Sequence, residues 1–215
     1  MPASTVLDSL ERGRGRGNGA GGGFFGDGDG SGGNDGGPPV QRVYVTGVLI
    51  AMGAILMFFA AFASAWVVRK GLSNGDWRAF PLPRILWLNT LILIASSVTL
   101  LHSRRSLRAR READYRHWWR VTAILGALFL AGQLLAWRQM FASGLFLATN
   151  PGSSFFYVFT AAHGLHVLGG IAALVAVAFY KPARLTRETA TQVVAMYWHF
   201  LAAIWIVIFA LLSRA

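Results

Sequence analysis

"SSFFYVFTAAHGLHVLGGIAALVAVAFY" occupies residues 153–180. Apart from a few hydroxyl groups and two histidines the stretch is apolar, and as a helix it is long enough to cross a hydrocarbon core of about 30 Å. His163, His166 and Gly170 are spaced so that they share one face of that helix. The stretch therefore predicts a membrane-spanning helix with a polar strip along one side.

Similar apolar blocks recur along the chain, which has 215 residues, of which 54% are hydrophobic and 13% charged. This composition is too apolar for an ordinary soluble domain. The five blocks of spanning length are Val43–Val68, Ile85–Leu101, Trp118–Trp137, Phe155–Tyr180 and Val193–Leu212. We expect an all-α integral membrane bundle of five transmembrane helices over residues 40–215. Cysteine is absent, which excludes disulfides and thiolate metal sites.

Residues 1–39 are predicted to form a disordered cytoplasmic tail. From 13 to 37, fourteen of twenty-five residues are glycine, and such a segment buries too little surface to offset its ordering entropy. The repeat "RGRGRG" at 12–17 is compatible with RNA binding, because Arg-Gly repeats bind single strands. A flexible leader is the favoured interpretation, and we expect no nucleic-acid partner.

The distribution of the positive charge between the two sides of the spans indicates how the chain is oriented in the membrane. Eleven of the twenty lysines and arginines fall on one side of the five spans and six on the other. The positive-inside rule then predicts that the N-terminus is in the cytoplasm and the C-terminus outside. The same residues are expected to contact anionic lipid headgroups.

The spans lack acidic residues, because all nine aspartates and glutamates lie outside them. Proton pumps and ion-coupled transporters usually carry carboxylates at membrane depth. This absence argues against a small transporter, which is nevertheless the alternative from a different functional class.

The few polar groups inside the spans include three histidines, His163, His166 and His199, together with Gln133 and Tyr197. Three histidines could in principle bind zinc, copper or a haem. The favoured interpretation is that their N–H groups bond across helices, or contact lipid, while small residues let the backbones approach.

The motifs of the last two spans resemble a known family. "SSFFYVFTAAHGLHVLGG" (153–170) and "AMYWHFLAAIWIVIF" (195–209), which contains Tyr197, Trp198 and His199, are similar to two signature stretches of subunit III of haem–copper respiratory oxidases. "PRILWLNTLILIASSVTL" (83–100), with Asn89, and "LGALFLAGQLLAW" (125–137), with Gln133, resemble further family motifs. The likeness covers about residues 43–213 and fits the five-helix bacterial form, which implies a bacterial inner (plasma) membrane.

The resemblance implies a subunit without a catalytic centre. Members of this family bind no haem or copper, which reside in subunits I and II, and they pack against subunit I as a bundle with a lipid-holding cleft. We therefore expect subunit I as the main partner, subunit II as another, phospholipid as a ligand, and no catalytic, cofactor or metal-binding residue in this chain. His163, His166, Gly170, Gln133, Tyr197, Trp198, His199 and Asn89 are the candidate structural or lipid-cleft residues.

The chain departs from the family pattern at three acidic positions. Ile55 and Ala202 occupy positions where the family usually has an acid, and another acid is replaced near Trp137. These departures argue against a direct role in proton handling. A diverged paralogue, or the related accessory protein of nitric oxide reductase, is the alternative within the family.

Overall fold

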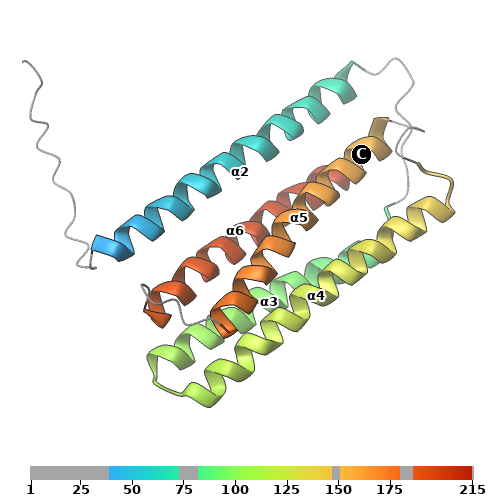
Figure 1. Ribbon diagram of the computed structural model, residues 1–215. Helices are drawn as coiled ribbons and strands as arrows, with labels where there is room; N and C mark the ends of the chain where they lie inside the picture. The colour runs from blue at the N-terminus through green and yellow to red at the C-terminus, as the bar shows by residue number, and fades with distance from the viewer. Residues whose placement is uncertain (1–38, 73–81, 147–150, 180–185, 215) are drawn as a thin grey trace, which may run out of the picture. The chain divides into compact units, whose positions relative to one another are not determined.

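The computed structural model describes residues 39–72, 82–146, 151–179 and 186–214, and these residues form five long helices. The helices are α2 (Pro39–Gly71), α3 (Ile85–Arg108), α4 (Glu112–Ala142), α5 (Pro151–Phe179) and α6 (Arg187–Leu212) (Figure 1). All five are long and apolar enough to span a membrane. The predicted all-α architecture is confirmed, while the predicted disorder of the tail falls almost wholly on residues outside the described ranges.

Each helix contains its predicted apolar block and extends beyond that block at one end or both. The one exception is Tyr180, the last residue of the fourth block, which lies outside the described residues. The shortest, α3, has 24 residues, so at a rise of about 1.5 Å per residue it is about 36 Å long. The additional turns carry charge. The acidic residues Glu112 and Asp114 stand in the first turn of α4 and Glu188 in that of α6, where a carboxylate is favoured by the helix dipole.

Helices α3 and α4 form an antiparallel hairpin through a tight turn. At the end of α3 the N–H of Arg111 donates to the carbonyl of Ser106 at 2.9 Å, and that of Arg110 donates to Leu107 at 3.0 Å. This is the Schellman pattern, which requires a left-handed residue, and Arg110 adopts it with φ 55°. The turn leaves only three residues between two membrane helices, so the hairpin packs along its whole length.

Helix α2 packs only on α6 and, less extensively, on α5 among the described helices. Most of its side chains are exposed, as expected for a helix that faces lipid or another subunit. Its last turn is held to the end of α6, because Lys70 Nζ donates to the carbonyl of Arg214. The same ammonium lies 4.9 Å from the centre of the Trp66 ring.

The centre of the α3–α6 bundle is the indole of Trp198. It is 1% exposed and its Nε1 donates to Ser96 Oγ on α3 at 3.0 Å. Glycines on the two remaining helices make room for it. A Cβ added at Gly126 on α4 would lie 2.6 Å from Trp198 Cη2, and one at Gly170 on α5 would lie 3.1 Å from the same ring. One side chain therefore contacts three neighbouring helices, with glycines permitting the approach.

Three other tryptophans satisfy their N–H groups across helix pairs. The Nε1 atom of Trp205 on α6 donates to Thr90 Oγ1 on α3 at 3.0 Å. From α4, Trp119 donates to the Leu174 carbonyl at 3.0 Å and Trp137 to Thr160 Oγ1 at 2.9 Å, both on α5. A buried indole N–H needs such a partner, so these bonds fix both the register and the rotation of the helices.

The close packing of Trp198 against Gly126 and Gly170 can be tested with matched glycine substitutions. We expect Gly126→Ala to lower the free energy of unfolding by about 1–3 kcal/mol, because the indole is buried and tied to Ser96 and cannot move aside. Gly164→Ala is the control, since its Cβ would lie 3.8 Å from Leu130 Cδ2, an ordinary contact. Thermal unfolding of the purified chain in detergent measures both. Equal stability of the Gly126→Ala and Gly164→Ala variants would contradict the close packing of Trp198 on Gly126.

Candidate functional site

His163 lies at the meeting point of four helices. Aromatic rings from the three neighbouring helices surround its imidazole: Phe59 of α2, Phe129 of α4 and Trp205 of α6, with ring centres at 6.4, 5.7 and 5.0 Å. The side chain is fully buried. Neither ring nitrogen makes a hydrogen bond with any described residue. The expected cross-helix bond from His163 is therefore not found, and ring packing takes its place.

His166 stands one turn further along α5 and faces α2. Its ring centre lies 5.7 Å from that of Phe59 and 6.4 Å from that of Phe58. Its Nδ1 is 2.7 Å from the carbonyl of Ala162 on its own helix. The cross-helix bond at this position comes instead from Tyr197, whose hydroxyl donates to the His166 carbonyl at 3.2 Å. His166 thus belongs to the α2–α5 interface.

The third histidine is not brought to the other two by any described contact. His199 is half-buried on α6, and its Nε2 is buried without a hydrogen-bond partner. Its neighbour Trp198 packs on Gly170, as described above. Within the ranges that the structure describes, no three His, Cys, Asp or Glu side chains are grouped closely enough to hold a metal ion.

Asn89 and Gln133 are the buried amides of the α3–α4 hairpin, 1% and 3% exposed. Asn89 Nδ2 donates to the Phe129 carbonyl at 3.3 Å, and a Cβ at Gly132 would clash with its Oδ1. The side-chain nitrogen and oxygen of Gln133 have no hydrogen-bond partner among the described residues. Phe129 contacts two of the motif residues: its carbonyl accepts the bond from Asn89, and its ring packs on the imidazole of His163.

The acid positions of the resembled family are occupied by packed apolar groups. Ile55 is partly buried against the core, and Ala202 is 8% exposed within it. These positions therefore take part in helix packing rather than presenting a titratable group.

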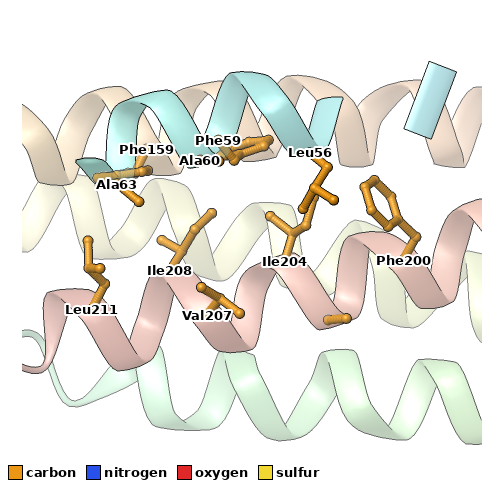
Figure 2. A pocket seen from close by; sticks show the side chains of 11 residues that line it. Leu56, Phe59, Ala60, Ala63, Phe159, Phe200, Ile204, Val207, Ile208 and Leu211 are labelled. Atoms are coloured by element: carbon orange, nitrogen blue, oxygen red, sulfur yellow. The ribbon is translucent and has the colours of Figure 1, made fainter. Parts of the chain in front are cut away.

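Beside the histidine pair lies an apolar cleft of about 420 Å³ between α2 and α6 (Figure 2). Its walls come from α2 and α6, with Phe159 of α5 between them. The lining residues are Leu56, Phe59, Ala60, Ala63, Phe159, Phe200, Ala203, Ile204, Val207, Ile208 and Leu211. None is polar, and the volume falls in the range of ligand pockets, about 300–1,000 Å³. Such a cleft can accept a hydrocarbon chain.

The family resemblance implied a lipid-holding cleft, and none of the candidate structural or lipid-cleft residues lines the apolar cleft between α2 and α6. Of the predicted residues, His163 and His166 adjoin it, because Phe59 both lines the cleft and packs on the two imidazoles. The small residues Ala60, Ala63 and Ala203 leave the space open. These three alanines were the only feature of the sequence that could have indicated the cleft. In uniformly apolar segments, however, small residues do not show which face of α2 packs on α6.

The comparisons with known proteins agree with the arrangement. The family model for cytochrome c oxidase subunit III matches residues 39–213. A probable cytochrome c oxidase subunit 3 from Nocardia farcinica is 33% identical, over 83% of this chain and 95% of that protein. Cytochrome c oxidase subunit 3 from Synechocystis sp. is 31% identical, over 83% and 77%, and that from Corynebacterium diphtheriae 31%, over 76% and 83%. The chain belongs to the cytochrome c oxidase subunit III family.

Proposed function

We propose that this chain is the non-catalytic subunit III of a haem–copper terminal oxidase and that it packs against subunit I, with subunit II nearby. The single observation that carries the proposal is the family match, which spans every helix of the bundle. The haems and copper would be held by the partner subunits. This chain would support aerobic electron transport and proton translocation by stabilising the complex.

We infer the orientation in the membrane from the end of the bundle at which the arginines gather. Arg187 at the start of α6 donates to Glu112 Oε2 at the start of α4, at 2.7 Å, so these two helix starts lie together. The turn after α3, with Arg110 and Arg111, is at the same end. The positive-inside rule favours a cytoplasmic location for this end, which supports an N-terminus inside and a C-terminus outside a bacterial plasma membrane.

The cleft between α2 and α6 would hold a lipid chain. Its lining offers apolar contact and no group that could recognise a charged headgroup, so binding there depends on the chain and not on the headgroup. A lipid in this position would cover the side of α2 next to α6. It would also stabilise the position of α2, which packs only on α6 and α5 among the described helices.

A direct part in proton transfer is not proposed. The positions that carry acids elsewhere in the resembled family are Ile55 and Ala202 here, packed in the bundle. Support of sustained turnover through contacts with subunit I fits these residues better. The nitric oxide reductase accessory protein and the small transporter gain no support from the relatives described above, which are named as oxidase subunits.

Co-purification tests the assignment to an oxidase. A tagged copy of the full chain, extracted from its native membrane in mild detergent, is expected to bring down a haem-bearing subunit with the absorbance spectrum of an oxidase. The measurement is a reduced-minus-oxidised difference spectrum together with mass spectrometry of the captured proteins. Capture of a nitric oxide reductase instead, or of the chain alone, would overturn the proposal.

The role of His163 can be tested separately from assembly. We expect His163→Leu to retain the stability of the chain, because an imidazole without hydrogen bonds is replaced by an apolar side chain of similar size. The haem and copper contents of the purified complex should also stay unchanged. Metal analysis and thermal unfolding measure the two outcomes. Loss of a stoichiometric metal ion from the variant complex would identify His163 as a ligand.

The cleft is tested by filling it. Ala60→Phe and Ala203→Phe each place a ring in the cavity, and we expect less lipid to remain bound after delipidation by detergent, irrespective of headgroup. Ala127→Phe on the exposed side of α4 is the control, since it lines no described cavity. Quantitative lipid extraction gives the count per chain. Wild-type lipid content in both cleft variants would refute a lipid site there.

A further inference from the structure

The C-terminal half of α2, residues 54–71, is docked on the rest of the bundle. It contributes two buried side chains, Phe59 and Trp66, each 5% exposed. The Phe59 ring packs on both imidazoles of α5. In the last turn Lys70 donates to the carbonyl of Arg214, beyond the end of α6. This half therefore has a fixed position relative to α5 and α6.

The N-terminal half of α2, residues 39–53, is held much less. From residue 42 to residue 53 no side chain is buried, and only Val45, Val48, Met52 and Gly53 are half-buried. A segment with few buried apolar contacts has low local stability against opening. The two halves of one helix therefore differ in how firmly the bundle holds them.

The amino-acid composition changes at the same place. Eight of the fourteen residues from 40 to 53 are glycine or β-branched, compared with one of the thirteen from 54 to 66. Glycine and β-branched residues form helix less readily than alanine, leucine or methionine. The weakly held half is thus also the half with the lower helix propensity.

Gly47 and Gly53 have a different role from the glycines of the core. A Cβ added at either position would meet no atom within 4 Å, whereas one at Gly126 would lie 2.6 Å from Trp198 Cη2. Packing within this chain therefore does not require glycine at these two positions of α2. The remaining effect of glycine is on the backbone, because it weakens a helix interior and is a common site of helix bending.

The cleft between α2 and α6 begins one turn beyond Gly53. Its wall on α2 runs from Leu56 to Ala63, wholly within the docked half. Figure 2 shows Leu56 and Phe200 of α6 at the same end of the cleft, the end nearer to Gly53. A bend at Gly53 would move the N-terminal half away from its neighbours and leave the α2 wall in place. It would therefore open this end of the cleft towards the bilayer.

We propose that α2 is hinged at Gly53, so that residues 39–52 swing on the docked half and act as a lateral gate to the α2–α6 cleft. A molecule dissolved in the bilayer can then enter the cleft from the side, without breaking the bond between Lys70 and Arg214. The hinge does not rest on the assignment to an oxidase, since every residue that forms it belongs to this chain.

The experiment measures distances between two spin labels by double electron–electron resonance, on the full chain in lipid nanodiscs. The chain has no cysteine, so labels attach only to introduced ones. Leu128→Cys on α4 is the common reference, because α4 makes no contact with α2 among the described helices. The second label is at Ile50→Cys, before the hinge, or at Val67→Cys, in the docked half. All three side chains are exposed.

We expect one narrow distance from the Val67 pair and two distances from the Ile50 pair. Gly53→Ala should lower the population of the second Ile50 distance about fivefold, because alanine favours the helix over glycine by about 1 kcal/mol. Gly47→Ala is the matched control. It too has open space for a Cβ, but it lies on the far side of Ile50 from the hinge and should leave both distances unchanged.

Three results would overturn the hinge: a single narrow distance from the Ile50 pair, a second distance that persists undiminished in Gly53→Ala, or an equal loss of it in Gly47→Ala. Two distances from the Val67 pair as well would mean that α2 moves as a whole, which also contradicts a hinge at Gly53. Thermal unfolding of Gly53→Ala, which should be no less stable than the wild type, separates a stiffened helix from a damaged one.

Discussion

The structure depends on one indole. Trp198 occupies the space between α3, α4 and α5, bonded to Ser96 and bounded by Gly126 and Gly170. In a membrane the hydrophobic effect does not drive helices together, so close packing and satisfied polar groups must do so. A single bulky residue seated against two glycines combines both requirements. The hydrogen bonds of Trp119, Trp137 and Trp205 then set the rotation of each helix about its own axis.

The sequence predicted the helices well, because an uninterrupted apolar block of spanning length has few alternatives in a bilayer. It predicted the helix ends less well. Charged turns such as Ser103–Arg108 continue α3 beyond its apolar block, and hydropathy alone does not show whether a polar segment stays helical. The tight turn at Arg110 was not foreseen, since it uses a left-handed residue that is not glycine.

The site could be predicted only as a set of motif residues. His163, Asn89 and Gln133 were singled out, and all three are buried in the bundle. Their partners depended on distances between helices that no spacing along the chain encodes. His163 therefore has aromatic neighbours in place of the expected cross-helix hydrogen bond. The apolar cleft beside it is lined by small residues such as Ala60 and Ala203, which were not among the candidate site residues.

The contacts of α2 have a consequence for biosynthesis. This helix is the first of the five to leave the ribosome, yet the described helices that it touches, α5 and α6, are the last. The bond from Lys70 to the carbonyl of Arg214 closes nearly the whole membrane domain. During translation α2 therefore crosses the bilayer without its partners in this chain until α5 and α6 have been inserted. Its most apolar stretch is the most hydrophobic of the five helices, and such a helix is stable in the bilayer without neighbouring helices.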